Sequence, residues 1–157
     1  MISLRILCQG ATGVDVNELQ SILPLEDLTK ATVSRISIGT PESVPAGQYA
    51  QDTLTSLKLW DPLQPKFVMA KDVTSVLNYV ETGNADAGFV YQTDAQGSTR
   101  VRIVTVLPTS SHKPIVYPAA IISATKNKQA TEDFLSYLKS PNAQQVFAKY
   151  GFTTLVN

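Results

Sequence analysis

Little in this sequence could build a covalent scaffold or carry the chain into a membrane. Its single cysteine, Cys8, excludes an internal disulfide and offers no partner thiolate for a metal site, so we interpret it as an incidental thiol. No apolar run is long enough to cross a bilayer. Residues 1–7 also lack the charged start and long apolar centre of a secretory signal. The chain as written is therefore expected to stay in the cytoplasm.

An excess of charge of one sign is missing as well. Thirteen Lys and Arg residues balance thirteen Asp and Glu residues, and neither sign forms a run. Because nucleic acids and anionic membranes attract basic surfaces, we predict no nucleic-acid partner. If the protein binds an anion, local backbone amides must attract it. With 43% hydrophobic and 17% charged residues, the composition is that of an ordinary globular protein with one sizeable core.

Residues that could form a catalytic or metal site are scarce. His112 is the one histidine, and it follows Ser111 on a loop, where adjacent side chains rarely point at one another. No G-x-S-x-G elbow is present. Asp86, Asp94 and Glu81 form no recognisable carboxylate pair or metal cluster. We predict that the protein is not an enzyme and that it has no catalytic residues and no metal cation site.

The sequence does contain an alternation of short apolar strands and amphipathic helices. Strands are predicted at residues 36–39, 67–70, 87–91, 101–107 and 115–122, and helices at 45–60, 73–82, 129–139 and 141–150. Strands separated by helical stretches of about a dozen residues are typical of an α/β fold. We expect a mixed, mostly parallel sheet with helices on both faces.

Two of the predicted helices each follow a strand after a short turn. Pro45 fits the first turn of a helix because the N–H that it lacks would have had no partner there, and Ala46 follows it. Asp72 is a typical N-cap, which makes Val73 the first helical residue. Tyr91 ends strand 87–91. Free amides at helix starts, reinforced by the helix dipole, can bind an anion without lysine or arginine.

Three longer motifs carry a family resemblance: PESVPAGQYA (41–50), AKDVTSVLNYVETGNADAGFVYQTDA (70–95) and SHKPIVYPAAI (111–121). From about Leu25 to Phe152 the chain resembles the periplasmic molybdate-binding proteins of ABC transporters. The resemblance implies a two-lobed, type II periplasmic-binding-protein-like fold that holds molybdate or tungstate between its lobes by hydrogen bonds alone. It also implies a membrane permease as partner, a periplasmic or cell-envelope location, and no cofactor, since molybdenum enters only as the oxyanion.

The resemblance further implies where the oxyanion binds. Its donors in the far lobe (residues 25–114) are expected to be the backbone amides of Ala46 and Val73 and the hydroxyl of Tyr91. Residues 115–157 would be a remnant of the near lobe, consisting of one strand and two helices. The serine donors of the near lobe have no counterpart here, so we expect weakened affinity. Sulfate is a third candidate ligand, because such donors read the charge and shape of all three oxyanions and cleft size decides.

Residues 1–24 are similar instead to the opening of peptidoglycan-binding repeats, with Asp15 as N-cap and Glu18 completing a capping box. One helix of a three-helix module cannot bind cell wall, so we expect a non-family segment without function there. The alternative function is an interaction or structural module. In that case the apolar surface left by the missing lobe would form a homodimer or leave residues 115–157 poorly packed.

Overall fold

The computed structural model describes residues 4–9 and 24–153. They fall into two compact units, which we describe separately. The sheet unit extends to Lys113, and the helical unit begins at Pro114.

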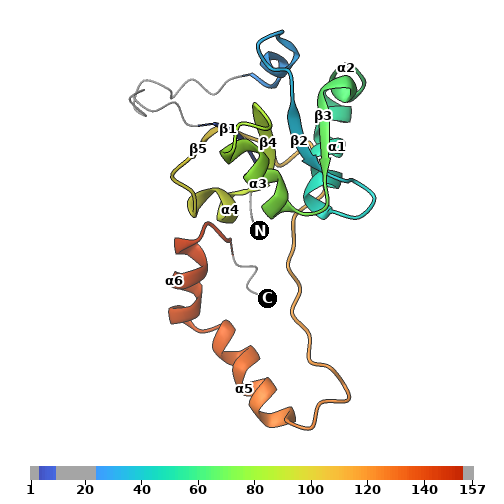
Figure 1. The fold of residues 1–157 in the computed structure, drawn as a ribbon. Coiled ribbons are helices and arrows are strands. Elements are labelled where there is room, and N and C mark those ends of the chain that lie inside the picture. The colour runs from blue at the N-terminus through green and yellow to red at the C-terminus, as the bar shows by residue number, and fades with distance from the viewer. Residues whose placement is uncertain (1–3, 10–23, 154–157) are drawn as a thin grey trace. The chain divides into compact units, whose positions relative to one another are not determined.

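In the sheet unit, the described strands form one five-stranded sheet in the order β3-β2-β4-β1-β5 (Figure 1). Strand β2 lies parallel to both β3 and β4, whereas β1 runs antiparallel between β4 and β5. The mixed, α/β character of the sheet agrees with the prediction. The strands are β1 (Leu4–Gln9), β2 (Ile36–Gly39), β3 (Phe67–Ala70), β4 (Ala87–Tyr91) and β5 (Val101–Val106).

Helices connect the parallel strands. Ala50 and Leu54 of α1 are fully buried, and so are Val76 and Val80 of α3, as expected for helices that each press one apolar stripe on a core. The helical segments of the sheet unit are η1 (Leu25–Thr29), α1 (Pro45–Ser56), α2 (Trp60–Leu63), η2 (Gln64–Lys66), α3 (Val73–Glu81) and α4 (Gln92–Gln96).

Helix α1 is shorter than predicted. We expected one helix from Pro45 to Trp60, but Lys58 adopts a positive φ of 59° and the amide of Leu59 donates to Leu54 O at 2.7 Å. This bond and the left-handed residue before it form a Schellman-type helix end. Burial of Leu59 stabilises the turn, and Trp60 begins the separate helix α2.

Residues 4–9 form part of the sheet, although the sequence analysis placed them in a separate non-family segment. Strand β1 occupies an inner position of the sheet and pairs with β4 from Leu4↔Tyr91 to Cys8↔Ala87. Ile6 is buried in the core. Sequence analysis missed this strand because its neighbours, β4 and β5, lie about 80 to 100 residues further along the chain. The predicted cap Asp15 and its partner Glu18 lie outside the described residues.

Two polar clusters fix the chain near the start of β2. The Lys66 ammonium donates to the three carbonyls of residues 28–30 at 2.8–3.0 Å, which satisfies the end of η1. Asp86 Oδ2 accepts hydrogen bonds from Ser34 N, Ser34 Oγ and Arg35 N at 2.8–2.9 Å. Burial raises the pKa of Asp86, but the hydrogen bonds from Arg35 and Ser34 outweigh it and leave this pKa below its ordinary value.

In the helical unit the predicted helices are present as α5 (Lys128–Leu138) and α6 (Pro141–Lys149). Ser140 caps α6 by accepting the Ala143 amide at 3.3 Å. The predicted strand 115–122 is wrong: within residues 114–153, which the structure describes, no strand is formed. Pro118 lacks a ladder donor, and a strand needs a neighbour that this unit does not supply.

Candidate functional site at the carboxyl edge of the sheet

Three neighbouring parallel strands deliver their carboxyl ends to one edge of the sheet (Figure 1). Strand β2 leads into α1, β3 leads into α3, and β4 ends at Tyr91 and leads into α4. The structure therefore places Ala46 and Val73 just after the ends of β2 and β3, and Tyr91 at the end of the adjacent strand β4. In open α/β sheets, ligands bind at this kind of edge.

The first turn of α1 lies directly on the end of β2. A Cβ built on Gly47 would lie 1.9 Å from Gly39 O, so only glycine allows the helix to start this close to the strand. Ala46 is 1% exposed. Among the described residues, no acceptor takes the Ala46 N–H, whereas the next amide, that of Gly47, donates to Val44 O at 2.9 Å. Within the described part of the chain, the Ala46 N–H is thus an unpaired donor at a helix start.

The start of α3 is capped by Asp72, whose Oδ1 accepts the Ser75 amide at 2.7 Å. Hydrogen bonds from the side chain and backbone of Ser75 lower the pKa of Asp72. The cap uses neither the Val73 nor the Thr74 amide, and no acceptor for either is found in the described part of the chain. The Val73 side chain packs against the core cluster below α3, so amide donation and burial are compatible.

Tyr91 is half-buried and stands at the junction of β4 and α4. Burial raises the pKa of Asp94, although hydrogen bonds from the backbones of Tyr91 and Asp94 partly oppose it. Sequence analysis did not predict α4. An aspartate three residues after Tyr91, before the buried Ala95, was the available signal for a short capped helix.

Together these groups offer neutral hydrogen-bond donors. Two amides at helix starts carry the partial positive charge of the helix dipole, and a tyrosine hydroxyl can donate beside them. Such a set suits an anion with several oxygen acceptors. In the ranges 4–9 and 24–153, no cluster of three or more His, Cys, Asp or Glu residues could hold a metal ion.

The Ser111-His112 pair is arranged differently from a nucleophile and its base. Ser111 Oγ lies 2.9 Å from Thr53 Oγ1 and donates to Pro108 O at 2.6 Å. His112 Nδ1 lies 2.7 Å from Lys113 O, and its ring packs on Tyr49 with centroids 5.6 Å apart. These contacts hold loop 108–113 on α1 and leave no bond between the hydroxyl and the imidazole.

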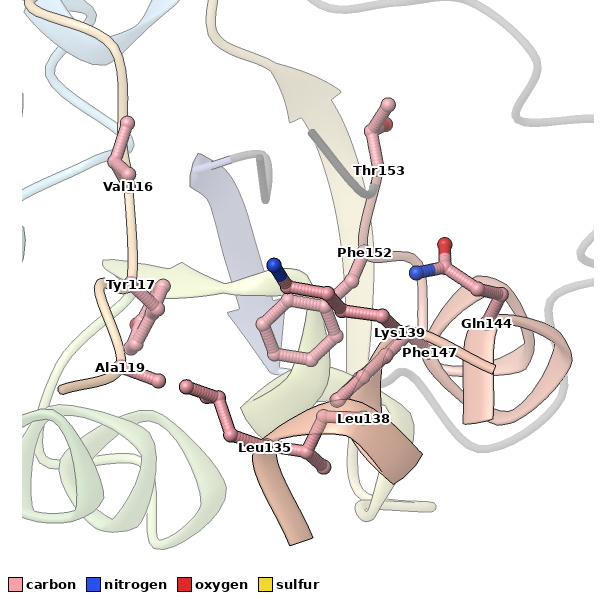
Figure 2. Close-up of a pocket in the computed structure, with 10 residues that line it drawn as sticks. All are labelled: Val116, Tyr117, Ala119, Leu135, Leu138, Lys139, Gln144, Phe147, Phe152 and Thr153. Carbon is pink, nitrogen blue, oxygen red and sulfur yellow. The ribbon is translucent and has the colours of Figure 1, made fainter. Parts of the chain in front are cut away.

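A cavity of about 380 Å³ lies within the helical unit (Figure 2). Figure 2 shows Tyr117, Leu135, Phe147 and Phe152 along its walls. The Phe152 ring packs edge-on against Tyr117 and Phe147, with centroids 5.8 Å and 6.0 Å apart. Because this lining is mainly apolar, the cavity provides few hydrogen-bond donors for an oxyanion.

None of the helices in the described residues is long and apolar enough to span a membrane.

Comparison with known proteins supports the predicted resemblance. A model of the bacterial extracellular solute-binding protein family matches residues 12–153. The lipoprotein YvgL of Bacillus subtilis, named as an ABC transporter substrate-binding protein, is 52% identical over 123 residues, which are 78% of this chain and 47% of the relative. The molybdate-binding protein ModA of Haemophilus influenzae is 43% identical over 144 residues, covering 92% of this chain and 54% of the relative.

A solved structure is similar over nearly the whole chain. It is described as the substrate-binding domain of a molybdenum ABC transporter from Clostridium difficile, with 37% identity and a TM-score of 0.79 over 99% of this chain and 64% of that one. This likeness confirms the predicted periplasmic-binding-protein-like α/β fold. The family match begins at residue 12, so family similarity reaches into the segment that was predicted to lie outside it. The chain spans about half the length of the curated relatives it matches.

Proposed function

Because the chain belongs to the family of bacterial extracellular solute-binding proteins, we propose that it serves as the substrate-binding component of an ABC transporter for molybdate or tungstate. It binds the oxyanion without chemical change and delivers it to a membrane permease at the cell envelope. In this proposal the sheet unit corresponds to the far lobe of the binding fold, and the helical unit corresponds to part of the near lobe.

The observation that carries this proposal is the convergence of three adjacent strand ends. The amides of Ala46 and Val73 have no acceptor in the described residues, and Tyr91 ends the strand beside them. We propose that these amides and the Tyr91 hydroxyl bind the oxyanion. Backbone amides fixed by helix starts lose little freedom on binding, so a dianion is held without a charged side chain.

Three donors account for weak binding only. Hydrogen bonds to a charged group contribute about 1.5–3 kcal/mol each, so three contribute roughly 4.5–9 kcal/mol. Association costs an estimated 4–15 kcal/mol in lost translational and rotational freedom. The 157 residues alone are therefore expected to bind molybdate with a dissociation constant in the high micromolar range or weaker. The matched relatives are about twice as long as the region that this chain covers, and donors on their remaining residues are not included in this sum.

Replacing Val73 by proline tests the proposal with little change to the fold. Proline fits the first helical position, and Asp72 before it is already extended, with φ −161° and ψ 168°. Val73→Pro removes the proposed donor, whereas the control Val73→Ala keeps the amide and loses only side-chain packing. Calorimetry with molybdate, tungstate and sulfate should show about tenfold or greater loss of affinity for Val73→Pro. Equal affinity of the two variants would overturn the proposed site.

Self-association is the second candidate function, in which a second copy covers the helical unit. Helix α5 has no buried residue. Phe134 and Tyr137 of α5 are 60% and 56% exposed, and Val146 of α6 is 55% exposed. Apolar side chains exposed on two helices favour association. Sedimentation should show a dimer that Phe134→Lys dissociates; a monomer at all concentrations would refute this candidate.

A further inference from the structure

We propose that Thr40 is a positioning residue of the oxyanion site, which sets the spacing between the amides of Ala46 and Val73. Thr40 is the first residue after β2, and it is hydrogen-bonded both to the end of β3 and to the turn that leads into α1. This inference rests on the proposed function, in which both amides bind the ligand.

Two donors of Thr40 reach one carbonyl at the end of β3. Its backbone N–H donates to Ala70 O at 2.9 Å, and its hydroxyl donates to the same oxygen at 3.2 Å. The ladder between β2 and β3 ends one residue earlier, at the pair Gly39↔Ala70. Thr40 therefore extends the contact between the two strands at the edge where the candidate site lies. Ala70 is buried, and a hydrogen bond shielded from water is stronger than an exposed one.

The carbonyl of Thr40 closes the turn that leads into α1. It accepts the Val44 amide at 2.8 Å and the Ser43 amide at 3.1 Å. Val44 is the buried N-cap of α1, and Ala46 follows two residues later. The position of the Ala46 amide is thus fixed relative to Thr40 through one hydrogen-bonded turn.

The segment from Thr40 to the second proposed donor is also short. Ala70, which accepts both Thr40 donors, is the last residue of β3, and Val73 begins α3 three residues later. Between them, Asp72 holds the start of α3 by accepting the Ser75 amide at 2.7 Å. Thr40 therefore joins the two segments that lead to the amides of Ala46 and Val73.

The hydroxyl makes this role specific to the Thr40 side chain. Any residue other than proline could donate its backbone N–H to Ala70 O, whereas a hydroxyl so close to the backbone needs serine or threonine. Two hydrogen bonds restrain the Ala70 carbonyl more than one does. Loss of the hydroxyl should therefore let the ends of β2 and β3 shift, and the distance between the two proposed donors should change with them.

The test is a titration of the full chain with molybdate, followed by NMR of the backbone amides, which can measure weak binding. Thr40→Val keeps the branched shape of the side chain but lacks the donor, and it should weaken binding by about three- to tenfold. Thr40→Ser keeps the hydroxyl and should bind within about twofold of the parent. In a Val73→Pro background, Thr40→Val should have no further effect, because the spacing of the two donors matters only while both bind.

Two results would overturn the inference. The first is unchanged affinity in Thr40→Val; a lower urea midpoint of unfolding in the same variant would then assign the hydroxyl a purely stabilising role. The second is an equal fold loss from Thr40→Val in the parent and in the Val73→Pro background, which would show that Thr40 does not act through the spacing. If Val73→Pro binds molybdate as tightly as Val73→Ala, the proposed function fails instead, and the role of Thr40 with it.

Hydrogen exchange of the Val44 amide tests the anchoring of the turn without any ligand. This amide donates to Thr40 O, and a substitution four residues away leaves its intrinsic exchange rate unaltered. Exchange should become about threefold or more faster in Thr40→Val and stay near the parent rate in Thr40→Ser. Unchanged exchange in Thr40→Val would refute the positioning role directly.

Discussion

Replacing Gly47 by alanine should displace the start of α1 and weaken the sheet unit. The added Cβ would lie 1.9 Å from Gly39 O and 2.6 Å from Gly39 C, whereas ordinary contacts are 3.4–4 Å. Both neighbours are backbone atoms, so the helix start must move by about 1.5 Å. Such overpacking costs about 1–3 kcal/mol. Alanine regains about 0.5–1 kcal/mol over glycine within a helix. Together these ranges give a net loss of about 0–2.5 kcal/mol, and because backbone atoms cannot rotate away from the added methyl group, we expect about 1–2 kcal/mol.

Urea unfolding followed by tryptophan fluorescence measures this loss in the sheet unit, because Trp60 is the only tryptophan and packs against Phe67 with ring centroids 4.8 Å apart. For a slope of about 2 kcal/mol/M, the midpoint should fall by about 0.5–1 M. Gly97→Ala is the matched control: its nearest contact would be 3.7 Å away and its φ is −79°. The control should be neutral or slightly stabilising. Equal midpoints for the two variants would refute the close-packing argument.

Three further predictions use the same assay. Lys66→Met should lower the free energy of unfolding by about 1–2 kcal/mol, because it removes the ammonium group that donates to three carbonyls. The control Lys71→Met, at an exposed lysine, should have little effect. Asp86→Asn should be less stable than the parent at pH values above the ordinary aspartate pKa of about 3.9. This loss of stability should vanish as the pH falls through the lowered pKa of Asp86 in the folded protein. A loss of stability that does not depend on pH would contradict the role of the charge. Ser37 and Thr53 are both 0% exposed, but of these two hydroxyls only that of Thr53 has a hydrogen-bond partner among the described residues. Ser37→Ala should therefore leave the free energy of unfolding unchanged or raise it, whereas Thr53→Val should lower it by about 1 kcal/mol. A larger loss in Ser37→Ala than in Thr53→Val would refute this assignment.

Local sequence patterns were sufficient for the elements whose stabilising signals lie close together in the chain. Pro45 and Asp72 mark the starts of α1 and α3, and the predicted strands β2, β3 and β4 have the observed bounds. Proline at a first helical turn and aspartate at an N-cap act within three residues of themselves, so their effects can be read without the fold. The candidate site residues follow from these boundaries together with the family resemblance.

Only the tertiary structure decided which strands are neighbours. Strand β1 was missed because it is stabilised by pairing with β4 and β5, and segment 115–122 is not a strand because the helical unit gives it no partner. Helix α4, which follows Tyr91, is too short to be recognised from periodicity. The order β3-β2-β4, which brings the ends leading to Ala46, Val73 and Tyr91 to one edge, likewise arises from pairing between distant segments. Strand pairing depends on backbone hydrogen bonds that every residue except proline can both donate and accept, so a single sequence specifies elements more directly than their order.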